Sequence, residues 1–193
     1  MKSDIILAGV GGQGILSIAA AIGQAVLIEK LFLKQSEVHG MSQRGGAVMS
    51  HMRISSEPVW SDLIPYGSAD MILSVEPMES LRYLPYLSDN GWVITNTRPF
   101  DNISNYPPMS EIEASLEKLT QKVYFDADEL AIKAGSIKAS NIVTLGAAIP
   151  FLPLQLASVV KGIELIFHAK GQQIIDFNLN ALHLGYEYAK NSK

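Results

Sequence analysis

The sequence has 193 residues, and 15 Lys and Arg against 19 Asp and Glu give a formal net charge of −4. With 48% hydrophobic and 18% charged residues, it has the composition of a globular chain with a core, which excludes intrinsic disorder. A slightly acidic chain without a run of like charges is not expected to bind nucleic acid or an anionic membrane. The absence of cysteine excludes disulfides, thiolate zinc sites, iron–sulfur clusters and thiolate nucleophiles.

The length predicts a single domain over residues 1–193. The apolar run at residues 5–10 is too short for a signal peptide, so an untargeted cytoplasmic protein is expected. A second stretch, between Lys138 and Lys161, contains no charged residue. Pro150 and Pro153 interrupt it together with polar residues, which favours two buried helices meeting at a proline turn over a membrane span.

The pattern of apolar residues predicts strands that alternate with helices. Strands are predicted over residues 4–9, 31–33, 47–54, 69–75, 91–96 and 122–126. Helices are predicted over residues 15–28, from Pro77, over residues 127–134 with Asp126 as the cap, and throughout the chain from Asn141 onward, whereas residues 97–110 are predicted to form a surface loop. This order predicts an α/β, Rossmann-like fold, with a mainly parallel sheet, helices on both faces and a helical C-terminal part.

A glycine-rich turn follows the first predicted strand and opens the first helix. Residues 9–14 read GVGGQG and satisfy the G-x-G-x-x-G pattern, which allows a tight turn, a close approach of backbone to phosphate and close packing of helix on sheet. The alternative is a turn needed only for packing. Candidate phosphate-binding residues here are Gly9, Gly11, Gly12, Gln13 and Gly14.

A polar loop is predicted after the second strand, over residues 36–46. In a parallel sheet it leaves the carboxyl end of that strand beside the glycine turn, where open α/β folds bind ligands. An arginine among glycines presents a planar fork to phosphate or carboxylate, although a polar turn with a solvated arginine is the alternative. The candidate binding residues of this loop are His39, Ser42, Gln43, Arg44 and Gly45.

The glycine turn and the polar loop, SEVHGMSQRGG, together resemble the gamma-type domain of the 2-oxoacid:ferredoxin (or flavodoxin) oxidoreductases. The resemblance spans about residues 5–189 and includes residues 141–147 and 178–186. Within this family, the chain length and the motif sequences resemble those of the two-chain type that acts on aryl pyruvates such as indolepyruvate.

The resemblance implies an oxidative decarboxylation in which a 2-oxoacid and coenzyme A give an acyl-CoA, carbon dioxide and reduced ferredoxin. It also implies that thiamine diphosphate and the iron–sulfur clusters sit on a large alpha subunit, which agrees with the absence of cysteine here. This chain would then hold no cofactor alone and would be inactive alone. The phosphates of coenzyme A would suit the glycine turn and Arg44, and the isolated chain could form a homodimer through the surface meant for its partner.

Other polar residues give weaker signals. His51 lies on an alternating strand and faces a site or serves as a structural histidine, the second being favoured. Glu76 follows a strand end and either binds a ligand or leads into the next helix. No other potential metal ligand stands at a suitable spacing from His168 or His183 in the sequence, so each is expected either to pack against other residues or to be exposed. No catalytic residue and no metal ligand is assigned.

A rival hypothesis is a self-sufficient nucleotide-binding module, either dehydrogenase-like or a redox-sensing regulator, which rests on the glycine turn alone. A dinucleotide dehydrogenase carries an acid at the end of its second strand to hold the ribose. The predicted strand at residues 31–33 runs instead into Lys34, Gln35 and Ser36, which counts against this hypothesis.

Overall fold

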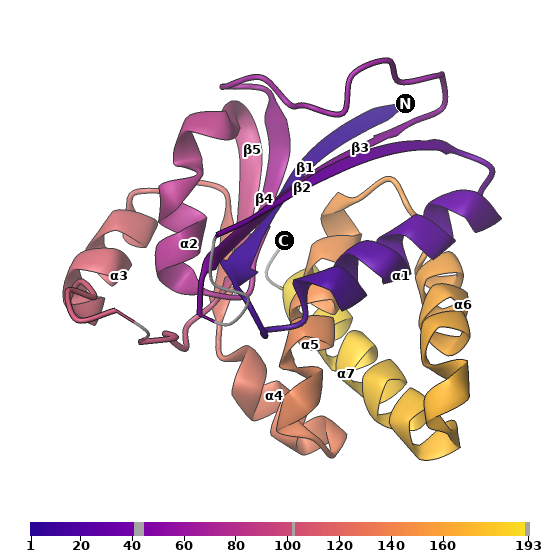
Figure 1. Ribbon diagram of the computed structural model, residues 1–193. Coiled ribbons are helices and arrows are strands. Elements are labelled where there is room, and N and C mark those ends of the chain that lie inside the picture. The colour runs from indigo at the N-terminus through magenta and orange to yellow at the C-terminus, as the bar shows by residue number, and fades with distance from the viewer. Residues whose placement is uncertain (41–44, 102, 192–193) are drawn as a thin grey trace.

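The computed structural model describes residues 1–40, 45–101 and 103–191, and it consists of a twisted sheet between two layers of helices (Figure 1). The strands are β1 (Lys2–Val10), β2 (Phe32–His39), β3 (Ala47–Ser55), β4 (Ala69–Ser74), β5 (Leu87–Asn96) and β6 (Lys122–Phe125), in the order β2-β3-β1-β4-β5-β6. Neighbouring pairs among β1, β4, β5 and β6 are parallel, and β3 is antiparallel to both β1 and β2. The expected α/β fold with a mainly parallel sheet is confirmed, with β3 as the antiparallel exception.

Helices cover both faces of the sheet (Figure 1). On one side lie α1 (Ile15–Ile28), α5 (Ser140–Ala148), α6 (Leu156–Phe167) and α7 (Gln172–Lys190), with α4 (Ala127–Ala134) packed on α5 and α7. On the other side lie α2 (Pro77–Arg82) and α3 (Met109–Glu117). Because side chains alternate along a strand, Ile5 and Leu7 of β1 enter the larger core cluster beneath the first layer, whereas Ile6 enters the smaller cluster beneath the second.

The second strand differs most from its predicted form. It extends to His39 rather than ending at Leu33, so the predicted polar loop starts too early, and its first residues, 36–39, belong to β2. These residues pair with β3 in a continuous register from Phe32 opposite Ser55 to His39 opposite Val48. Since β2 is the edge strand, its polar side chains stay near solvent, and the apolar pattern that identifies a buried strand is missing.

Several helix boundaries agree with their sequence signals. Helix α2 begins at Pro77, and α4 begins after Asp126, whose carboxylate accepts a hydrogen bond of 2.9 Å from the Glu129 N–H. The uncharged stretch forms α5 and α6, which are joined through the Pro150 and Pro153 region. In the residues that the structure describes, no helix is both long and apolar enough to cross a membrane.

Two glycines allow α5 and α7 to approach closely. A Cβ atom on Gly146 would lie 2.1 Å from the carbonyl oxygen of Leu182, and one on Gly185 would lie 1.9 Å from that of Val143. Both distances are far shorter than any real Cβ contact, so the two helices pack backbone against backbone. Their crossing fixes the amino-terminal end of α5, which faces the glycine turn.

Candidate functional site

The glycine turn joins β1 to α1 at the carboxyl edge of the parallel strands. Gln13 closes the turn, because its side-chain Oε1 accepts a 2.8 Å hydrogen bond from the Val10 N–H, and its own N–H donates to the Val10 carbonyl at 3.1 Å. Gly14 takes the N-cap position of α1 in the left-handed conformation and offers no side-chain cap. The first N–H groups of α1 are therefore directed at the space beyond the turn, where an anion is favoured by the helix dipole.

The glycines of this turn serve different purposes. A Cβ on Gly9 would lie 2.5 Å from Val75 and 2.9 Å from Ile15, so this position is required for packing. Gly12 also has positive φ, but nothing lies within 4 Å of where its Cβ would be. The surface above Gly12 is open, and a ligand can approach the backbone there.

Asn141 connects the start of α5 to the glycine turn. Its Nδ2 atom donates a 2.9 Å hydrogen bond to the Gly14 carbonyl, and a Cβ on Gly14 would lie only 2.5 Å from the same nitrogen. The contact explains why a glycine and an asparagine stand at these two positions, which are far apart in the sequence. It holds the turn in one conformation.

The polar loop contacts the other side of the turn. The Gly11 N–H donates to the Gly46 carbonyl at 2.8 Å, and the Gly45 N–H donates to the Gly11 carbonyl at 3.2 Å. His39 ends β2, and its Nε2 atom contacts the Glu37 carboxylate. The predicted site residues Ser42, Gln43 and Arg44 lie outside the described residues.

A cavity of about 680 Å³ opens beside the glycine turn. Its walls come from the turn, the ends of β4 and β5, the starts of α4 and α5, the end of α6 and the first half of α7. This is the carboxyl edge of the sheet, where open α/β folds bind ligands. Of the predicted site residues that are described, Gly12, Gln13 and Gly14 line the cavity, whereas Gly9, Gly11, His39 and Gly45 do not.

Three cationic side chains line the cavity, and sequence reasoning assigned none of them to a site. They are Arg98, after β5, Lys138, before α5, and Lys170, between α6 and α7. Arg98 forms an ion pair of 2.7 Å with Asp126, and Lys170 lies 5.2 Å from the centre of the Phe167 ring. Although burial acts in the opposite direction, hydrogen bonds from the Glu129 N–H and from Arg98 lower the pKa of the Asp126 carboxyl.

Aromatic rings and a polar cluster complete the lining. Phe100, Phe167 and Phe177 supply apolar surface. Asp128, which also lines the cavity, accepts hydrogen bonds from Ser140 and, at 3.1 Å, from the Asn96 amide, and so links β5, α4 and α5. Cations, exposed backbone N–H groups and flat apolar surface together suit a ligand that carries phosphates and an aromatic ring.

Glu76 supports the cavity wall from behind. It is fully buried, caps α2 by accepting a 2.8 Å hydrogen bond from the Glu79 N–H, and also accepts from the Phe100 N–H at 3.2 Å and from the Tyr106 hydroxyl. Burial and the neighbouring Glu76 raise the pKa of the Tyr106 hydroxyl. Glu76 therefore fixes the segment that carries Phe100, and it does not line the cavity itself.

The histidines lie outside the cavity. His51 is buried, and its Nδ1 accepts a 3.1 Å hydrogen bond from the Ile64 N–H, as expected for a structural histidine. His168 is exposed, and His183 is also exposed and contacts the Leu179 carbonyl. Among the described residues, no group of three or more His, Asp or Glu side chains is arranged to hold a metal ion.

Comparison with known proteins places this geometry in context. Residues 4–188 match the family model described as pyruvate ferredoxin/flavodoxin oxidoreductase. The chain is 39% identical to the indolepyruvate oxidoreductase subunit IorB of Pyrococcus horikoshii, over 97% of this chain and 96% of that protein. It is also 39% identical to the subunit of the same name from Methanothermobacter thermautotrophicus, over the full length of both.

A solved structure shares the fold. The 2-oxoglutarate:ferredoxin oxidoreductase from Magnetococcus marinus, described with 2-oxoglutarate, coenzyme A and succinyl-CoA bound, matches with a TM-score of 0.78 at 21% sequence identity. The match covers 98% of this chain and 31% of that longer chain. The same fold is thus one part of a larger polypeptide in that enzyme.

Proposed function

The chain belongs to the pyruvate ferredoxin/flavodoxin oxidoreductase family, and from this membership we propose that it is the small, non-thiamine subunit of an indolepyruvate ferredoxin oxidoreductase. The enzyme would convert indolepyruvate or another aryl pyruvate, with coenzyme A, into the aryl acetyl-CoA, carbon dioxide and reduced ferredoxin. The relatives cited above are matched over 96% and 100% of their own length and are named as subunits. The similarity to these subunits gives no support to the alternative of a self-sufficient nucleotide-binding module.

The chemistry of decarboxylation and electron transfer belongs to the partner in this proposal. Thiamine diphosphate and the iron–sulfur clusters would sit on a large alpha subunit, through which the complex reduces ferredoxin. The present chain has no cysteine with which to bind a cluster. Residues 1–193 would act as a single gamma-type domain that is inactive alone.

The role of this chain would be to bind and orient coenzyme A. The observation that carries this assignment is the cavity at the carboxyl edge, where the open backbone at Gly12 lies with Arg98, Lys138 and Lys170. Coenzyme A carries a pyrophosphate, a 3′-phosphate and an adenine ring. The N–H groups at the start of α1 would donate hydrogen bonds to the pyrophosphate, the cations would face the phosphates, and the phenylalanine rings would contact adenine.

The residues predicted on the polar loop are also proposed to bind coenzyme A. Gly45 and Gly46, which follow Ser42, Gln43 and Arg44 in the sequence, are hydrogen-bonded to Gly11 of the glycine turn. Arg44 would contact a phosphate of coenzyme A, because a guanidinium offers paired donors to phosphate oxygens. His39 would take part only through this loop, since it ends β2 outside the cavity.

The test is an assay of the reconstituted complex. The chain is co-expressed with the large thiamine-dependent subunit from the same genome, and reduction of a viologen dye is followed with varied coenzyme A and aryl pyruvate. We expect activity from the complex and none from either chain. Lys138→Ala and Lys170→Ala should raise the KM for coenzyme A by about tenfold or less, with the KM for the oxoacid unchanged.

Lys161→Ala is the matched control, because Lys161 lies on α6 outside the cavity and pairs with Glu164. It should leave both KM values unchanged. Full activity of the isolated chain would contradict the subunit assignment. An active complex whose coenzyme A dependence is the same in all three variants would contradict the role of the cavity.

A further inference from the structure

The sheet has a face over β2 that the helices of the second layer leave accessible. Val38 stands opposite Met49 in the register of β2 and β3, and Met49 packs against the smaller core cluster, so Val38 and Phe32 point to the side away from α1. Their exposed fractions are 55% and 46%. Helix α2 packs over β1, β4 and β5, and the buried members of that cluster come from these strands, α3 and Ile64.

The loop between β3 and β4 adds larger apolar side chains at this side of the sheet. Residues 56–68 contain neither helix nor strand, and Trp60, Leu63 and Tyr66 are exposed by 91%, 55% and 72%. Loops of this length without secondary structure are uncommon in compact domains and often serve a function. The loop runs along the amino-terminal edge of β1 and β4, opposite the edge that holds the cavity.

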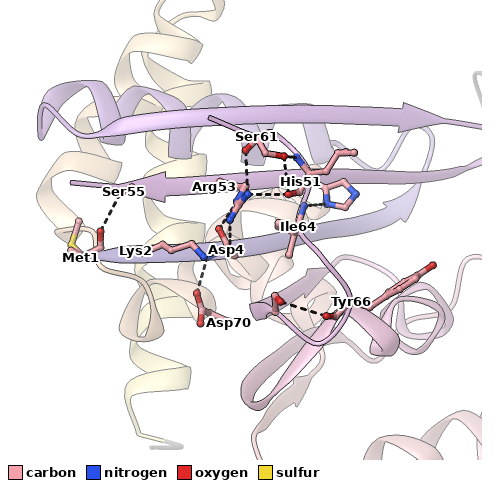
Figure 2. A network of polar contacts seen from close by, with 12 residues as sticks. Met1, Lys2, Asp4, His51, Arg53, Ser55, Ser61, Ile64, Tyr66 and Asp70 are labelled. Atoms are coloured by element: carbon pink, nitrogen blue, oxygen red, sulfur yellow. Dashed lines mark hydrogen bonds and ion pairs between the residues drawn. The ribbon is translucent and has the colours of Figure 1, made fainter. Parts of the chain in front are cut away.

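Polar contacts fix the backbone of this loop (Figure 2). The Arg53 guanidinium donates to both carboxylate oxygens of Asp4, at 2.9 and 3.1 Å, and to the carbonyls of Ser61 at 3.3 Å and Leu63 at 3.0 Å. His51 accepts from the Ile64 N–H at 3.1 Å. The loop is thereby joined to β3 and, through Asp4, to β1.

The buried end of this network is also fully bonded. Asp4 has no exposed surface, its carboxylate pairs with Lys2 at 2.8 Å, and its N–H donates to Asp70 at 2.8 Å. The ring of Tyr66 packs on that of Tyr86 with centroids 4.5 Å apart. A buried ion pair gains little stability over apolar packing, so the network is better explained by the fixed conformation that it gives the loop.

We propose that Phe32, Trp60, Leu63 and Tyr66, here called the aromatic loop face, form the docking surface for the large thiamine-bearing subunit. This inference rests on the proposed function. Tryptophan and tyrosine are enriched among the residues that dominate binding energies, and a loop held in its bound conformation loses little entropy on association. An exposed apolar group of this kind on a fixed loop marks an interaction site.

Charge and architecture favour this occupant. Between residues 56 and 70 the chain carries Glu57, Asp62 and Asp70 and no Lys or Arg, whereas Lys2 and Lys34 are exposed on the neighbouring strands β1 and β2. The partner surface should therefore place basic side chains against the loop itself. In the Magnetococcus structure the same fold is 31% of a longer chain, so there it is covalently joined to the rest of that polypeptide. Docking at the amino-terminal edge leaves the cavity at the carboxyl edge open to coenzyme A.

The experiment measures binding of the tagged chain to the co-expressed large subunit, by co-purification and by titration of the separated chains. Trp60→Ser combined with Tyr66→Ser should weaken the complex by at least about tenfold, and Asp62→Lys should weaken it and reduce its salt dependence. The control is Ile132→Ser combined with Leu165→Ser, since these apolar residues are also exposed but lie on α4 and α6. Far-ultraviolet circular dichroism checks that every variant is folded.

Each outcome decides between the two proposals. Binding by the wild type and the control, but not by the Trp60/Tyr66 variant, supports the docking surface. Equal binding by all variants overturns the docking surface and leaves the proposed function intact. A wild-type chain that does not bind the large subunit overturns both, and self-association that the Trp60/Tyr66 variant abolishes would then assign the face to a second copy of this chain.

Discussion

Replacing Gly146 by alanine is expected to destabilise the protein by about 2–4 kcal/mol. The added Cβ would lie 2.1 Å from the Leu182 carbonyl oxygen, so α5 and α7 would have to separate by about 1.3 Å to reach ordinary contact at 3.4 Å. Overpacking of backbone against backbone costs about 3–5 kcal/mol at the upper end of such substitutions. The better helix propensity of alanine offsets about 1 kcal/mol of this.

Gly23→Ala is the matched control, because it is the same substitution within helix α1. A Cβ there would meet only Leu33, at 3.6 Å, which is ordinary van der Waals contact. The control should therefore stabilise the protein by about 0.5–1 kcal/mol. Urea unfolding followed by circular dichroism measures both, and the Tm of Gly146→Ala should fall by about 5–12 °C. A Gly146→Ala variant as stable as the wild type would refute the argument from close helix approach.

Three further predictions concern the cavity wall and the buried polar groups. Asn141→Leu removes the hydrogen bond to Gly14 and should raise the KM for coenzyme A about three- to tenfold in the assembled enzyme, with a smaller change in kcat. A fall in kcat as large as the rise in KM would argue that Asn141 does not act by positioning the turn. Glu76→Gln leaves one acceptor oxygen for the three donors that the carboxylate now satisfies. Urea unfolding should therefore show a loss of about 2 kcal/mol in the free energy of unfolding. An unchanged value would contradict the conclusion that Glu76 supports the cavity wall. Burial lowers the pKa of His51 below 6.5, so protonation favours the unfolded chain and the free energy of unfolding should fall as the pH drops below about 6.5. The amide oxygen of His51→Gln can accept the hydrogen bond from the Ile64 N–H but does not titrate. Melting curves should therefore show a smaller loss of stability between pH 7.5 and 5.5 for this variant than for the wild type.

The parts of the fold that the sequence predicted are those with local causes. The turn at residues 9–14 follows an apolar strand and begins a helix, and Asp126 and Pro77 mark helix starts by their own chemistry. The long C-terminal helices were visible because small and apolar residues recur there at helical length. Helix α3 was not predicted, because it follows a proline-rich segment and only two of its residues, Ile112 and Leu116, are buried.

Two features depended on pairing between distant residues and could not be read locally. The polar half of β2 is a strand because β3 binds it at the sheet edge, and the antiparallel direction of β3 follows from that hairpin. The cationic wall of the cavity combines Arg98, Lys138 and Lys170, each of which is more than 80 residues from the glycine turn. One signal was available: Lys138 immediately precedes the uncharged stretch that leads into α5.

The position of β1 constrains how the chain is synthesised and folded. This first strand lies inside the sheet, between β3 and β4, so it has no hydrogen-bonded neighbour until those later strands have left the ribosome. The core between the sheet and the first helix layer is completed later still, because α5, α6 and α7 are made last. A stalled or truncated chain would therefore expose apolar sheet surface to solvent, and such intermediates are the ones that chaperones bind and that aggregate.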